Sequence, residues 1–188
     1  MRRWLAVLLL ALLLPARTSA TTLLAMYLDD LTSQSQTVAY GTVVASRVEW
    51  DAAHRWIFTI YTVQPSQYLK GHLGASFELR EPGGERDGIG MMVPSVPHFD
   101  VGAEAVFFVW TDPKGFHQVS GFEQGAVSIL TDPATGARTA SRMIPLGSAR
   151  TSASASSSSA ASTSRALPQL LEQIRVSVAS SRPDRSGE

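Results

Sequence analysis

The stretch TVAYGTVVASRVEWDAAHRWIFTIYTV, residues 37–63, contains two long runs of strand-forming residues around a short break. Valine, isoleucine, threonine and aromatic residues dominate both runs, as is typical of β-strands. In the first run, 37–50, alternation predicts one shared face for Val38, Tyr40, Val44, Val48 and Trp50. The break at 51–55 has the length of a hairpin turn. The stretch therefore predicts two adjacent antiparallel strands.

Further strand patterns follow this pair. Residues 75–81 alternate, which directs Phe77 and Leu79 inward, and residues 104–110 are almost entirely apolar. Pro65 interrupts the second run and favours an edge or a bulge there. Shorter runs at 116–122 and 126–130 bring the total to about six strands, and a turn at 132–136 precedes a further short one. This pattern predicts an all-β domain over residues 21–147, a small antiparallel barrel of the oligonucleotide/oligosaccharide-binding (OB) type.

Helical patterns flank the predicted barrel. Leu24, Leu28 and Leu31 have the spacing of a short N-terminal helix. Residues 148–165 are a low-complexity Ser/Ala segment, which predicts a flexible, disordered linker. Residues 166–180 regain a helical face, formed by Leu167, Leu170, Leu171, Ile174 and Val178. We expect this C-terminal helix to pack either on the barrel or on a partner, and residues 181–188 to be a disordered tail.

The N-terminus predicts the compartment. Residues 1–20 combine an arginine-containing start, an apolar run from Trp4 to Leu14 and a small-residue end at Ala20. This is the layout of a secretory signal peptide cleaved after Ala20. Its apolar run is shorter than the ~20 residues that a spanning helix requires, so we expect no stable membrane anchor after cleavage. The sequence therefore predicts a secreted or periplasmic bacterial protein.

Composition narrows the classes of partner. Removal of residues 1–20 leaves 13 basic and 16 acidic residues, a net charge of about −3. This charge argues against nucleic acid, which is bound by clustered lysine and arginine. The chain has no cysteine, so its fold depends on core burial without disulfides. An extracellular protein is the partner class that we expect.

Several segments resemble a group of uncharacterised secreted bacterial proteins over residues 23–146. The shared features are Gly41 in the first strand, Leu69-Lys70-Gly71, the EPGGE run at 81–85 and Gly102-Ala103-Glu104. Their strand pattern is similar to the netrin-type module, the OB-like barrel of tissue inhibitors of metalloproteinases. The resemblance implies the barrel alone, because those inhibitors reach the zinc of a protease through a disulfide-fixed N-terminal cysteine, which this chain lacks.

The loop after the strand at 75–81 is the main candidate for a ligand site. In one interpretation its Glu81, Glu85, Asp87 and His98 are metal ligands or an acid/base pair, but their spacing matches neither an EF-hand loop nor HExxH. We favour a connection in which Pro82-Gly83-Gly84 turns the chain while Gly88 and Gly90 run close to the barrel. Long loops on barrels are frequent ligand sites. The candidate ligand or partner residues are Glu81, Gly83, Gly84, Glu85, Met91, Met92 and His98.

No motif in the sequence points to catalysis, a cofactor or a metal. The histidines, His54, His72, His98 and His117, lack ligand spacing, and no GxSxG motif occurs. An aromatic face for sugars, built from Trp50, Trp56, Trp110 and three tyrosines, competes with plain core packing, which we favour. We therefore expect a secreted, non-catalytic binding module. The alternatives are an inhibitor or accessory factor of an extracellular protease, by fold analogy, and an enzyme with an unrecognised site.

Overall fold

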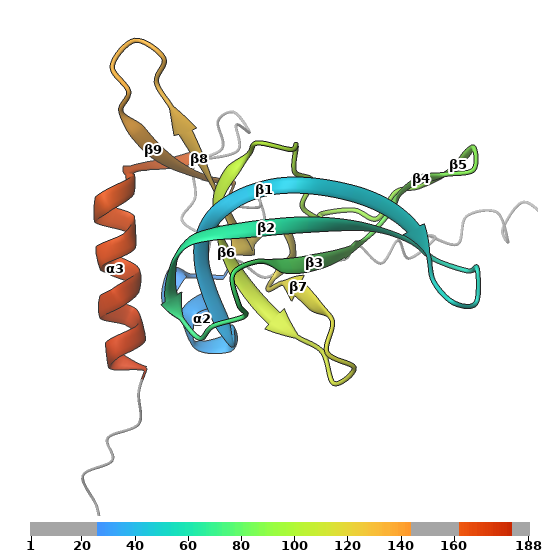
Figure 1. Ribbon diagram of the computed structural model, residues 1–188. Helices are drawn as coiled ribbons and strands as arrows, with labels where there is room; N and C mark the ends of the chain where they lie inside the picture. Colours follow the sequence, from blue (N-terminus) through green and yellow to red (C-terminus); the bar gives the residue numbers. More distant parts are fainter. Residues whose placement is uncertain (1–25, 144–161, 182–188) are drawn as a thin grey trace, which may run out of the picture.

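A computed structural model describes residues 26–143 and 162–181 (Figure 1). The predicted signal peptide, most of the predicted linker and residues 182–188 lie outside these ranges. Within them the predicted small OB-like β-barrel with two flanking helices is confirmed. None of the helices in the described ranges has the length and apolar composition to span a membrane.

Five strands close the barrel. They are β1 (Thr37–Trp50), β2 (Ile57–Lys70), β3 (Phe77–Pro82), β6 (Glu104–Thr111) and β7 (His117–Val119). β1 pairs with β2 and β6, β2 with β3, and β6 with β7, all antiparallel. The ring closes through a parallel contact between β3 and β7, with Leu79 opposite His117. The expected antiparallel barrel thus has one parallel seam.

Further elements extend this barrel. β8 (Ala126–Thr131), β9 (Arg138–Met143) and β10 (Ser162–Ala166) continue the sheet from β6, whereas β4 (Gly84–Arg86) and β5 (Ile89–Met91) form a separate hairpin. The helices are α2 (Leu28–Gln34), the short 3₁₀-helix η1 (Phe122–Gly125) and α3 (Leu167–Ser180). In Figure 1, α2 and α3 lie on the side of the barrel away from the β4–β5 hairpin.

Apolar side chains form two cores. One fills the barrel and includes Tyr61, Phe77, Leu79, Phe99 and Phe107. The other lies between the outer face of the sheet and the helices, and includes Leu31, Val38, Phe108, Leu170 and Ile174. α3 therefore packs on the barrel of its own chain, which decides between the two expectations for this helix.

A β-bulge in β1 makes the single-face prediction for residues 37–50 wrong. The register against β2 shifts between Val43 and Ala45, so Val44 is the extra residue and is 43% exposed. Before the bulge, Val38 and Tyr40 face the helices, and after it Val48 lines the end of the barrel. The bulge favoured near Pro65 is confirmed, because β1 and β2 change register beside it, between Tyr40 and Gly41. The strand itself is not interrupted, since β2 continues through Pro65 to Lys70.

Two predicted boundaries also change. Residues 162–165 were assigned to the flexible linker, but they belong to β10, which pairs with β9 from Ser162 to Ala166. Backbone hydrogen bonds to β9 are enough to form this strand and do not require strand-forming side chains. The Ser/Thr-rich sequence therefore gives little indication of a strand. The strand expected at 116–122 covers only β7, because Gly121 and Phe122 take positive φ values of 68° and 59° and turn the chain into η1.

Candidate functional site at the end of the barrel

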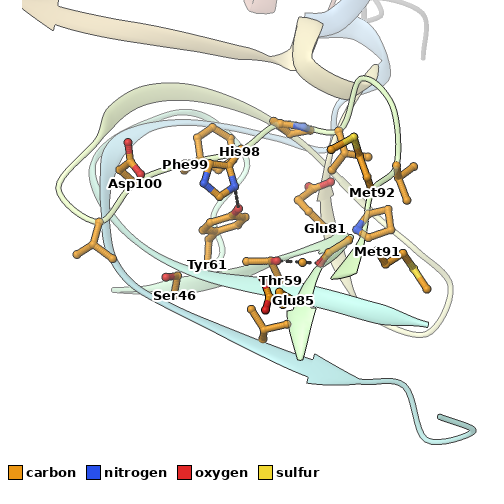
Figure 2. Close-up of a pocket in the computed structure, with 18 residues that line it drawn as sticks. Ser46, Thr59, Tyr61, Glu81, Glu85, Met91, Met92, His98, Phe99 and Asp100 are labelled. Atoms are coloured by element: carbon orange, nitrogen blue, oxygen red, sulfur yellow. Dashed lines mark hydrogen bonds between the residues drawn. The ribbon is translucent and has the colours of Figure 1, made fainter. Parts of the chain in front are cut away.

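A cleft of about 690 Å³ opens at the end of the barrel, beneath residues 92–101 of the connection between β5 and β6, which ends at residue 103 (Figure 2). β1, β2 and β3 form one wall, and the β4–β5 hairpin and this segment form the other. All seven candidate residues from the sequence lie in its lining: Glu81, Gly83, Gly84, Glu85, Met91, Met92 and His98. The fold thus gathers into one cleft residues that the sequence places along a single loop.

Glu81 is the most buried charged side chain of the cleft. It is only 4% exposed, because it continues the inward face that Phe77 and Leu79 form on β3. Its Oε1 accepts a hydrogen bond from the backbone N–H of Val119 at 2.7 Å. Burial raises the pKa of this carboxyl to about 7, although the bond from Val119 opposes that shift. The sequence prediction has Glu81 as the last residue of the strand at 75–81 and also counts it among the loop candidates, without predicting that its side chain points inward.

Tyr61 and His98 form a second polar pair in the cleft. The Tyr61 hydroxyl and His98 Nδ1 are 3.1 Å apart and share a hydrogen bond. Tyr61 is buried on β2, and burial raises the pKa of its phenol. His98 is exposed at the rim, as predicted, but its ring is fixed by this bond. In Figure 2, Glu81 lies between this pair and the two methionines.

The segment over the cleft is anchored at three points. The Phe99 ring packs edge-on against Tyr61 and Phe107, with centroid distances of 5.1 and 5.3 Å. The backbone N–H of Glu123 donates to the carbonyl of Ser95 at 2.9 Å, and that of Gly102 donates to Val43 at 2.7 Å. These contacts fix the position of the segment over the cleft.

Gly83 and Gly84 shape the wall between β3 and β4. Both have positive φ, 114° and 126°, which favours glycine. A Cβ atom on Gly84 would lie 2.7 Å from Thr59 Oγ1 and 3.0 Å from Val48 Cγ1. Thr59 Oγ1 donates in turn to the Gly83 carbonyl at 2.9 Å. The prediction that Pro82-Gly83-Gly84 turns the chain is wrong, because β3 passes into β4 through Gly83 alone and without a turn. The two glycines instead bring the backbone against two strands.

The prediction that Gly88 and Gly90 run close to the barrel is wrong. Within the described residues, no atom beyond their chain neighbours lies within 4 Å of a Cβ built on either glycine. Asp87 and Gly88 instead form the two-residue turn of the β4–β5 hairpin, with φ values of 55° and 76°. Asp-Gly is a strong hairpin signal that the sequence prediction missed. Met92, next to this hairpin, is 93% exposed at the cleft rim, whereas Met91 is half-buried.

Comparisons with known proteins give no family assignment. No protein-family model, curated protein or solved structure matches this chain. Within the described ranges, no group of three or more His, Cys, Asp or Glu side chains is placed to hold a metal ion. The geometry of the cleft therefore carries the functional argument.

The aromatic residues do not gather on one face. Tyr40 and Tyr61 are buried in different cores, as core packing predicts, whereas Trp56 and Trp110 are 49% and 40% exposed. Trp50 donates a hydrogen bond from Nε1 to Asp87 at 2.9 Å and so ties β1 to the β4–β5 hairpin. These positions favour the cleft over an aromatic face as the candidate site.

Proposed function

We propose that the protein is an exported, non-catalytic binding module whose ligand enters the cleft beneath residues 92–101. The observation that supports this most is a cleft that combines apolar wall surface with a buried carboxyl. Val48, Met91 and Phe99 supply apolar surface, and Glu81 supplies a buried carboxyl. Ligand sites in proteins commonly combine these features.

The hydrogen bonds of the cleft support binding over catalysis. Among the described residues, the Glu81 carboxyl bonds only to backbone, and the Thr59 hydroxyl donates to a backbone carbonyl. The Tyr61 hydroxyl forms a hydrogen bond with the His98 imidazole. Burial raises the pKa of the Tyr61 phenol, which opposes formation of a nucleophilic phenolate. These groups are arranged to receive a ligand rather than to attack one. The protease-inhibitor alternative is supported by the resemblance to netrin-type barrels alone.

Site-specific photo-crosslinking in the producing organism tests the proposal. A benzophenone amino acid replaces Met92, which is exposed at the rim of the cleft. The matched control carries it at Leu130, which is 60% exposed on β8, outside the lining of the cleft. We expect one discrete adduct from position 92 that is missing from position 130. Identical adduct patterns at both positions, or none at position 92, would contradict a binding role for the cleft.

A further inference from the structure

The charge of the cleft is one-sided. Glu81, Glu85 and Asp100 line it, while no lysine or arginine does so among the described residues. Arg86, on the same hairpin, is engaged elsewhere: it donates to the carbonyl of Val48 at 2.9 Å and lies 3.6 Å from Asp87. The carboxyl groups of the cleft therefore lack a cationic partner from the described chain.

Glu81 retains one oxygen for a ligand. Oε1 is used by Val119, whereas Oε2 has no hydrogen-bond partner among the described residues. A buried carboxylate without a counter-charge is costly, and burial raises the Glu81 pKa to about 7 against the opposing effect of the Val119 hydrogen bond. The groups around it do not relieve this cost. The lining also holds Tyr61 on β2, Glu85 on β4, and His98 and Asp100 on the connecting segment. Among the described residues, none of these four side chains forms a hydrogen bond with Glu81.

The remaining surface fits an alkyl chain. Val48, Met91, Val93 and Val96 give the walls an aliphatic character, and the rings of Tyr61 and Phe99 add aromatic surface. Methionine side chains adapt to the shape of a guest. Lysine and arginine side chains bury their methylene stems along such surfaces while the cationic head finds an acceptor. A purely apolar guest would give the Glu81 carboxyl no partner and would favour its protonated form.

We propose that the guest of the cleft is a basic side chain, arginine or lysine, from an extracellular partner protein, with its cationic head paired to Glu81. This inference deepens the proposed function and rests on it. The pair forms best when Glu81 is ionised, so near neutral pH binding of a basic guest releases a proton from Glu81.

Two peptides that differ only in charge test the inference on the purified full chain. Acetyl-Ala-Arg-Ala-amide is compared with the isosteric, neutral acetyl-Ala-citrulline-Ala-amide. The readout is the ¹³C-methyl NMR signal of Met91, with Met26, which packs under the helices, as the internal reference. We expect the arginine peptide to shift the Met91 signal with a Kd about tenfold below that of the citrulline peptide.

Two variants assign the effect to Glu81. We expect E81Q to reduce the affinity for the arginine peptide to that for the citrulline peptide. The control E172Q, at an exposed position on α3 outside the lining of the cleft, should change that affinity by less than about threefold. The Met26 signal reports whether each variant is folded. Calorimetry in buffers of different ionisation enthalpy should show release of about half a proton at pH 7 by the wild type and none by E81Q.

Three outcomes would overturn the inference: equal affinity for both peptides, binding of neither, or unchanged affinity in a folded E81Q variant. A discrete crosslink from position 92 in any of these cases would leave the proposed function standing, with a guest of different chemistry. Failure of that crosslink as well would remove the proposed function itself.

Discussion

Glu81 Oε1 accepts a hydrogen bond from the backbone N–H of Val119, two residues beyond the point where the β3 and β7 backbones pair. That pairing, between Leu79 and His117, is the parallel seam that closes the barrel. The Glu81 side chain thus extends the seam where the backbone ladder ends. One carboxylate oxygen serves closure of the barrel, and the other is available to the cleft.

Burial of Glu81 predicts a stability that falls as the pH rises. Its pKa is about 7 in the folded protein and about 4.5 in the unfolded chain, so between these values the folded state holds more protons. This group alone should lower the free energy of unfolding by roughly 3 kcal/mol across that range. Urea unfolding of the wild type and E81Q at about pH 5 and about pH 8 measures it. E81Q should gain stability relative to the wild type at the higher pH, and a constant difference would count against a buried carboxyl.

The Tyr61–His98 hydrogen bond should fix the segment over the cleft. Tyr61→Phe keeps the ring packing against Phe99 and removes this bond, so we expect a loss of about 1 kcal/mol in the free energy of unfolding. Amide hydrogen exchange should become faster in the segment around His98 while protection in β1 is retained. Exchange that becomes faster throughout the protein, or that does not change at all, would show that the bond does not hold this segment.

Gly84 should be intolerant of a side chain. Gly84→Ala places a Cβ 2.7 Å from Thr59 Oγ1 at a φ of 126°, and we expect a loss of about 1–3 kcal/mol in the free energy of unfolding. Gly90→Ala is the matched control, since its Cβ meets no described atom within 4 Å and its φ is not positive. Denaturant unfolding compares the two variants. Similar losses in both would contradict the close approach of Gly84 to β2.

Because α3 packs on the barrel of its own chain, we expect a large loss of stability when the Ile174 side chain is shortened. This residue is fully buried in the core under the helices, so Ile174→Ala should cost about 2–5 kcal/mol in the free energy of unfolding. Val176→Ala, on the exposed side of the same helix, should change stability by less than about 0.5 kcal/mol. If the two variants melt at the same temperature, α3 does not pack on the barrel in solution.

Residues with a local signal were predicted well from the sequence. Alternation directs Phe77 and Leu79 into the barrel, as observed. Helical spacing puts Leu167, Leu170 and Ile174 on one face of a helix, and the structure shows that this face packs against the sheet. The bulge at Val44 was missed because it depends on pairing with β2, and β10 was missed because its pairing with β9 is non-local. The cleft depends on the pairing of β1, β2 and β3 and on the distant anchors of the segment 92–101, neither of which the sequence shows. The sequence could therefore list the residues of the cleft without showing that Glu81 is buried among them.

The most direct measurement is the pH titration of the Glu81 side-chain carboxyl carbon by NMR, without and with the arginine peptide. We expect a midpoint near 7 for the protein alone, because the carboxyl is buried without a cation, and a lower midpoint once the peptide supplies one. A midpoint near the ordinary value of about 4.5 in the protein alone would show that Glu81 is not buried as described, and a midpoint that the peptide leaves unchanged would show that no cation pairs with it.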